Sequence, residues 1–149
     1  MALEIRNFNS YQEMKRIHQE EFNKFPLGAA FSNEQFNEMM KKWNLDPEKD
    51  CDKIYSIGCG CFIRKSDAQE FHDINQRFRE EEKQFRKSMK KAVDQFYHEL
   101  ANHEYCITHD LEPTLDACGI SVEEFEKNQF LKNAMKKALV KYKKNCRYC

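Results

Sequence analysis

Residues 66–102 decide the fold, and they read SDAQEFHDINQRFREEEKQFRKSMKKAVDQFYHELAN. Their apolar members are separated mostly by three, four or seven positions: Phe71, Ile74, Phe78, Phe85, Met89, Val93, Phe96 and Leu100. This spacing places them along one stripe of an α-helix. The sequence therefore predicts one long central helix, roughly 50 Å in length at about 1.5 Å per residue. Because Glu81 and Glu82 interrupt the stripe, we expect two packed ends and a solvated or partner-facing middle.

The composition favours a mostly helical protein. The 149 residues fit one domain over 1–149, and 34% of them are charged, with only four Gly and three Pro. This balance is typical of helices and unlike that of a β-sandwich. We expect an α+β fold, a mostly helical single domain with a small antiparallel β-hairpin sheet and the long central helix.

Local signals place the other elements. Capping boxes at Ser10/Glu13, Ser32/Gln35 and Ser121/Glu124 predict three helix starts, and Ser66 or Asp67 is expected to cap the long helix. Residues 3–8 alternate in polarity, as a short edge strand does. Residues 53–65 predict a β-hairpin around a Gly-Cys-Gly turn. A basic amphipathic helix is expected over about 128–145, with a flexible Cys-rich end at 146–149.

The formal net charge is zero, but basic and acidic residues are segregated along the chain. No Asp or Glu follows Glu126, and the residues after it carry a charge of +8, so the first 126 residues carry −8. Such a basic segment is typical of a chain that binds an acidic partner such as nucleic acid. It is also typical of a helix that docks on the acidic body of its own domain. The sequence leaves both interpretations open.

Two basic stripes are the candidate binding residues, since phosphate contacts need such cations. The first lies in the second half of the long helix: Lys83, Arg86, Lys87, Lys90 and Lys91. The second lies in the C-terminal segment: Lys132, Lys136, Lys137, Lys141, Lys143, Lys144 and Arg147.

A zinc site is the alternative use of the chain's polar residues. Cys146 and Cys149 form a terminal C-x-x-C, and His103 and Cys106 could complete four N and S ligands. One C-x-x-C without a second pair is a weak pattern, so we expect no cofactor and keep zinc as the alternative.

Motifs of catalysis are incomplete. The Gly58-Cys59-Gly60 turn lacks the Gly-Lys-Ser/Thr end of a phosphate-binding loop. His98-Glu99 begins like a metalloprotease helix, but Asn102 stands where its second histidine is needed. We expect a protein that is not an enzyme.

The start of the chain has no signal-peptide pattern, and no apolar run is long enough to span a bilayer. Seven cysteines without the dense spacing of a secreted scaffold favour a reducing compartment. We expect a cytoplasmic protein without a membrane partner.

Much of the amino-acid sequence is similar to one known family. The matching segments are NFNSYQEM at 7–14, AFS at 30–32, QF at 35–36, KIYSIG at 53–58, FIRKSD at 62–67, NHEYC at 102–106 and EPTLD at 112–116. The chain resembles a family of small uncharacterised proteins from Bacillota and their phages and integrative elements. That resemblance implies no reaction and no catalytic residues.

The resemblance implies a mobile-element protein in a bacterial host cell. We expect a non-enzymatic, anti-CRISPR-like binding protein that modulates or inhibits a host or defence nucleoprotein complex. An acidic surface that mimics nucleic acid, or the basic helix on a nucleic-acid backbone, would supply the charge complementarity. The alternatives are a nucleic-acid-binding accessory protein that uses the basic C-terminal helix and a zinc-stabilised structural protein.

Overall fold

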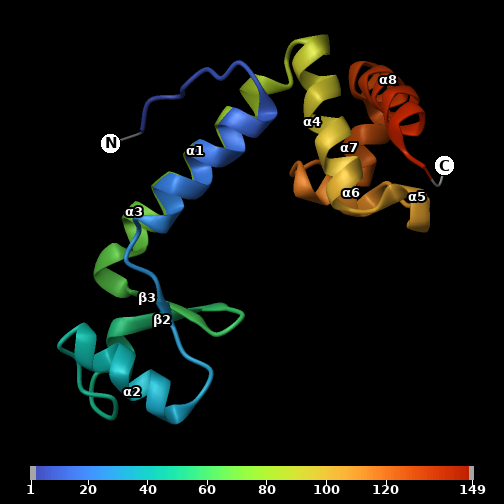
Figure 1. Cartoon of the computed structure of the whole chain (residues 1–149). Helices are drawn as coiled ribbons and strands as arrows, with labels where there is room; N and C mark the ends of the chain where they lie inside the picture. The colour runs from blue at the N-terminus through green and yellow to red at the C-terminus, as the bar shows by residue number, and fades with distance from the viewer. Residues whose placement is uncertain (1–2, 148–149) are drawn as a thin grey trace. The chain divides into compact units, whose positions relative to one another are not determined.

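The computed structural model describes residues 3–147, which are mostly helical and include a small three-stranded antiparallel sheet (Figure 1). The predicted α+β class is therefore confirmed. The chain folds as two compact units. One comprises Gln19–Gln76, and the other comprises Glu4–His18 with the chain after Gln76. The expectation of one domain over 1–149 stays a prediction.

The long helix predicted over 66–102 is wrong in its extent. The segment forms two helices, α3 (Ala68–Phe85) and α4 (Met89–Asn102), with Arg86–Ser88 between them. The helix does not continue through Ser88, because Ser88 has an extended backbone and its Oγ accepts the N–H of Lys91 at 3.2 Å. A serine in this role is a helix N-cap. It lacks the Glu or Gln three positions later that would complete a capping box.

The first unit contains the sheet, in the order β1-β3-β2. The predicted hairpin is present as β2 (Ile54–Gly58) and β3 (Cys61–Arg64). The third strand is β1 (Gly28–Ala29), which pairs with β3. Gly28 is required there, because a Cβ on it would lie 2.5 Å from Met39 Sδ. Met39 belongs to α2 (Asn33–Lys42), whose N-cap Ser32 accepts the N–H of Gln35 as predicted.

The strand predicted over residues 3–8 is absent from the described residues, which have no regular structure there. The backbone N–H of Arg6 donates to Glu81 Oε1 at 3.2 Å instead of pairing with a strand. The segment leads into α1 (Tyr11–Asn23), which begins with the predicted Ser10/Glu13 capping box.

The second unit is built around α4 and α8 (Gln129–Asn145), which lie side by side (Figure 1). Ala92 on α4 and Ala134 and Ala138 on α8 are fully buried in one core cluster. Small residues at a helix contact let the two backbones approach closely. α8 agrees with the helix predicted over about 128–145, and Asn128 caps it by accepting the N–H of Leu131.

Three short helices close this core: α5 (Tyr105–Thr108), α6 (Glu112–Ala117) and α7 (Val122–Lys127). Gly119 follows α6 with φ of +68°, a conformation that a residue with a side chain adopts only at a cost. Ser121 caps α7 as predicted, because its Oγ accepts the N–H of Glu124. α6 and α7 contribute Leu115 and Phe125 to the core.

Candidate functional site

A groove in the second unit brings the two predicted basic stripes together. It has a volume of about 860 Å³. Lys90 and Lys91 from α4 and Lys137 and Lys141 from α8 line it, with Met89, Val93, Asp94, Asn9 and Ser10. The four lysines therefore face one space, although the two stripes lie more than 40 positions apart in the sequence.

The pairing of the four ammonium groups distinguishes them from Lys127 and Lys132 in the same unit. In the described part of the chain, none of them forms an ion pair with a carboxylate. Lys127 and Lys132, by contrast, pair with Glu123 at 2.6 Å and Glu126 at 3.3 Å. The groove thus gathers four lysine charges that form no ion pair with the acidic side chains described by the structure.

Ring faces hold two of the groove lysines. Lys141 Nζ lies 4.2 Å from the centroid of the Tyr97 ring, and Lys91 Nζ lies 5.4 Å from that of Phe85. A ring face orients an ammonium group without cancelling its charge. These contacts place the cations while leaving their charge available to an anion.

Asp94 is the one carboxylate that lines the groove, and it already has partners. Its Oδ2 accepts the backbone N–H of Tyr11 at 2.8 Å, and its Oδ1 lies 3.2 Å from His98 Nε2. The negative charge of Asp94 is therefore engaged at the start of α1.

A smaller pocket of about 200 Å³ shares Lys91 with the groove. Arg6, Lys87 and Ser88 also line it, together with Asn7, Phe8, Glu81, Gln84 and Phe85. Because Lys91 lines both hollows, the basic surface continues from the groove to Lys87. Lys87 is exposed, as a contact residue must be.

Arg86 is not part of this surface, so its prediction as a partner-binding residue is wrong. Its side chain is buried, and one guanidinium nitrogen donates to the carbonyl of Cys118 at 3.0 Å and to Gln95 Oε1 at 3.4 Å. A buried guanidinium with such partners holds the loop after α6 onto α4. It has a structural role inside the second unit.

The remaining predicted cations lie outside the groove lining. Lys83 is exposed and lies 3.7 Å from Glu80. Lys132 is half-buried on α8. The other cations are exposed along α8 or just after it: Lys136, Lys143, Lys144 and Arg147. They add to the positive field without lining the groove.

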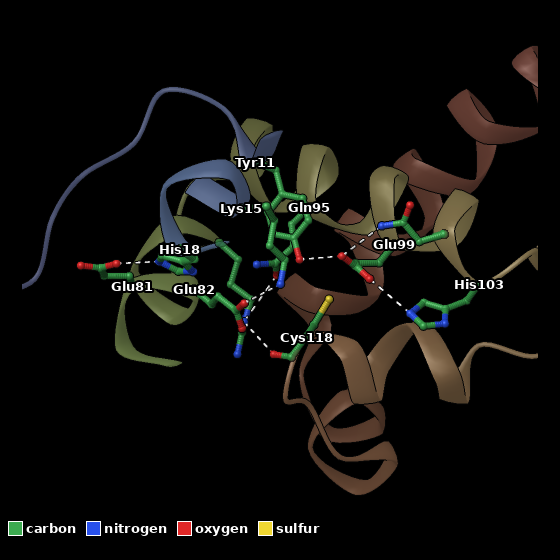
Figure 2. Close-up of polar contacts among 11 residues, drawn as sticks. Tyr11, Lys15, His18, Glu81, Glu82, Gln95, Glu99, His103 and Cys118 are labelled. Atoms are coloured by element: carbon green, nitrogen blue, oxygen red, sulfur yellow. Dashed lines mark hydrogen bonds and ion pairs between the residues drawn. The ribbon is translucent and has the colours of Figure 1, made fainter. Parts of the chain in front are cut away.

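A buried polar network lies beside the groove, and Figure 2 shows its side chains pointing toward one another. The Tyr11 hydroxyl donates to Glu99 Oε1 at 2.7 Å, and His103 Nε2 lies 3.3 Å from Glu99 Oε2. Burial, reinforced by the Glu99 charge, raises the pKa of Tyr11 far above its usual range. Tyr11 therefore stays protonated and keeps donating to Glu99.

Cys118 lies in the same buried region and is 1% exposed. Burial, with a contribution from the charge of Glu99, raises the pKa of its thiol to about 12. Nucleophilic cysteines need the opposite, a lowered thiol pKa. The bond between Tyr11 and Glu99 joins α1 to α4, and the expectation of a non-enzymatic protein stays a prediction.

A second polar centre surrounds Glu81, which is 1% exposed. Arg6 Nε donates to Glu81 Oε1 at 2.9 Å. His18 Nε2 lies 2.7 Å from Glu81 Oε2, as Figure 2 shows by a dashed line. Burial works to raise the pKa of Glu81, but the bonds from Arg6 and His18 outweigh it and hold the pKa below its usual range. Burial of His18 lowers the pKa of its imidazole, and the Glu81 bond opposes that shift only in part. The solvated middle of the long helix predicted around Glu81 is therefore wrong.

Two polar residues on the apolar face of α4 indicate buried hydrogen bonds, and the sequence interpretation missed them. Gln95 and Glu99 are buried, and they lie three positions after the buried Ala92 and Phe96, respectively. Polar residues on an apolar helix face need partners in the core. The identity of those partners, above all Tyr11, is not encoded in local spacing.

The predicted zinc ligands are not gathered in the described residues. His103 contacts Glu99, and the backbone N–H of Cys106 donates to the Tyr142 hydroxyl at 3.1 Å. Over residues 3–147, no group of three or more His, Cys, Asp or Glu is placed to hold a metal ion. Cys149 lies outside the described residues, so the four-ligand zinc site stays a prediction. No helix in the described chain is both long enough and apolar enough to cross a membrane.

Comparison with protein families finds one match: residues 10–141 match a family of unknown function, DUF7659. The match covers every groove residue except Asn9. It confirms the expectation of an uncharacterised family, while the expected origin in Bacillota and their mobile elements stays a prediction. Neither the curated proteins nor the solved structures contain a match to this chain.

Proposed function

The chain belongs to this family of unknown function, DUF7659, and we propose that it is a non-enzymatic protein that binds the nucleic acid of a host nucleoprotein complex. The groove supplies the binding surface. The buried networks around Glu81 and Glu99 supply the rigid scaffold that positions it.

The observation that carries this proposal is the convergence of Lys90, Lys91, Lys137 and Lys141 on one groove, where no carboxylate of residues 3–147 forms an ion pair with them. Phosphate groups are the anions that such point charges bind, and the affinity they give is independent of sequence. Lys137 and Lys141 lie four residues apart on α8, which separates their Cα atoms by about 6 Å along the helix axis. That repeat is comparable to the separation of neighbouring phosphates in a nucleic-acid strand.

A direct test compares two double variants that remove the same charge. Lys137→Gln/Lys141→Gln removes two groove cations, whereas Lys127→Gln/Lys132→Gln removes two cations that already pair with Glu123 and Glu126. Binding to a fluorescein-labelled 20-nucleotide strand is measured by anisotropy at low salt. We expect the groove variant to bind at least tenfold more weakly than the control variant. Equal affinities for the two variants would contradict the proposal.

We also propose a biological setting, which is more specific than nucleic-acid binding alone. A phage or mobile element encodes the protein, which acts in the cytoplasm of the host cell and inhibits a defence nucleoprotein in an anti-CRISPR-like manner. The sequence resemblance and the lysine groove support this setting, because a basic groove is suited to a guide or target strand.

A plaque assay tests that setting. Cells with an active RNA-guided defence express either the natural protein or Lys137→Gln/Lys141→Gln, and phage plaques are counted. We expect the natural protein to restore plaques and the groove variant to restore fewer. If the natural protein leaves the plaque count unchanged, the defence-inhibitor setting is wrong, while binding to nucleic acid is still judged by the anisotropy test.

A further inference from the structure

The shape and chemistry of the lysine groove point to single-stranded nucleic acid, not duplex, as its ligand. We infer that one strand lies in the groove, with its phosphates on Lys90, Lys91, Lys137 and Lys141 and its bases against Met89 and Val93. This inference rests on the proposed function and specifies the ligand of the same site.

The first argument is the volume of the groove. About 860 Å³ is in the range of pockets that enclose whole small molecules, which is about 300–1,000 Å³. A short run of nucleotides fits a hollow of this size. A duplex of the same number of nucleotides per strand has about twice the volume, so it is enclosed less well by a hollow of this size.

The second argument is the lining between the lysines. Met89 and Val93 are half-buried on α4 and pack against the core, yet both line the groove. A duplex presents its phosphates outward and stacks its bases inside, so the faces of its bases cannot contact an apolar surface. A single strand exposes the faces of its bases, which gain from contact with apolar groups.

The third argument is the path that the cations mark. Lys91 lines both the groove and the adjoining pocket, which adds Lys87. Arg6 also lines that pocket, but its guanidinium pairs with Glu81. The lysines thus continue beyond the groove, as cations do in proteins that track a single-stranded backbone. No aromatic side chain lines the groove itself, so we expect little preference for base sequence.

The test uses the full chain and two probes of equal length. One is a fluorescein-labelled 20-nucleotide strand of mixed sequence, and the other is the same strand annealed to its complement. We expect the single strand to bind at least tenfold more tightly than the duplex at the same salt concentration. Inorganic polyphosphate, which has phosphates but no bases, is expected to compete several-fold less well per phosphate.

Two nearly isosteric variants examine the apolar lining. Met89→Gln and Val93→Thr are expected to weaken single-strand binding several-fold and to leave the salt dependence unchanged, because no cation is lost. Should either variant fail to fold, the comparison of the two probes on the natural protein still decides the question.

The outcomes separate this inference from the function on which it rests. Equal or tighter binding of the duplex, or competition by polyphosphate that equals that of the strand, overturns the single-strand inference and leaves binding to nucleic acid intact. Salt-insensitive or absent binding of both probes overturns the inference and the proposed function together.

Discussion

The hydroxyl of Tyr11 donates a 2.7 Å hydrogen bond to Oε1 of Glu99, 88 positions later in the chain, and the bond is buried. It joins the first turn of α1 to the last turn of α4 inside the second unit. The same turn of α1 meets Asp94, which lines the lysine groove. The bond therefore helps to fix the segment that forms one side of the candidate site.

Removal of the Tyr11 hydroxyl is expected to destabilise the protein. Tyr11→Phe leaves the buried Glu99 without its shortest hydrogen bond, which costs about 1–3 kcal/mol of unfolding free energy. Urea denaturation measures this loss. Tyr97→Phe is the matched control, because the Tyr97 hydroxyl bonds only the exposed Asn145 side chain, and we expect a change below about 0.5 kcal/mol.

A double variant sharpens this prediction. If the hydroxyl acts through Glu99, Tyr11→Phe combined with Glu99→Gln loses less stability than the sum of the two single losses. Strict additivity would show that the hydroxyl of Tyr11 does not act through Glu99.

The protein is expected to lose stability as the pH falls from about 7.5 to 5.5. The fold lowers the pKa of His18, so the unfolded chain takes up a proton on this residue at a higher pH than the folded chain does. The stabilisation is fully present above the unfolded pKa of about 6.5 and is lost as the pH falls below it. Glu81, whose pKa is also lowered, adds a further loss below about pH 4.3.

The variant His18→Gln separates the two contributions. It lacks the titrating imidazole, so its melting temperature should change less than that of the natural protein between pH 7.5 and 5.5. His72→Gln is the control, because His72 is exposed and should leave the natural pH dependence in place. A pH dependence of His18→Gln as steep as that of the natural protein would show that His18 does not titrate in this window.

Arg86 is expected to matter for stability and not for binding. Arg86→Met leaves the carbonyl of Cys118 without its buried donor, which costs about 1–3 kcal/mol of unfolding free energy. Lys87→Met, at the exposed neighbouring position, should change stability by less than about 0.5 kcal/mol. Weaker oligonucleotide binding by Arg86→Met at unchanged stability would show that Arg86 contributes to the binding surface.

Ser88 is expected to be the residue that starts α4. Ser88→Ala removes the side-chain acceptor for the N–H of Lys91 and should cost about 1 kcal/mol in thermal or urea unfolding. Ser66→Ala serves as the comparison, because Ser66 lies in a 3₁₀ turn and its side chain caps no described helix. Equal effects of the two substitutions would mean that Ser88 does not act as a cap.

Much of the architecture was predictable because its signals are local. The capping boxes at Ser10, Ser32 and Ser121 each mark a helix start, since the partner of each serine lies three residues away. The Gly58–Gly60 turn likewise predicts the hairpin, because its positive φ angles suit glycine. The break at Ser88 escaped prediction, because neither Pro nor Gly marks it and the apolar spacing continues across it.

The candidate site was predictable only as two separate stripes. Helical spacing indicates that Lys90 and Lys91 share a surface, and that Lys137 and Lys141 share another. Only tertiary packing of α4 on α8 shows that the two pairs line one groove. The partners of Glu81 and Arg86 are equally non-local, so both residues looked like surface charges in the sequence.

The salt dependence of binding tests the central claim most directly. Four lysine–phosphate contacts with a single strand predict a slope of log K against log[salt] of about −3, and loss of two of them predicts about −1.5. We expect the first slope for the natural protein and for Lys127→Gln/Lys132→Gln, and the second for Lys137→Gln/Lys141→Gln. A natural slope near zero, or the same slope for all three proteins, would contradict the claim that the groove lysines bind phosphate.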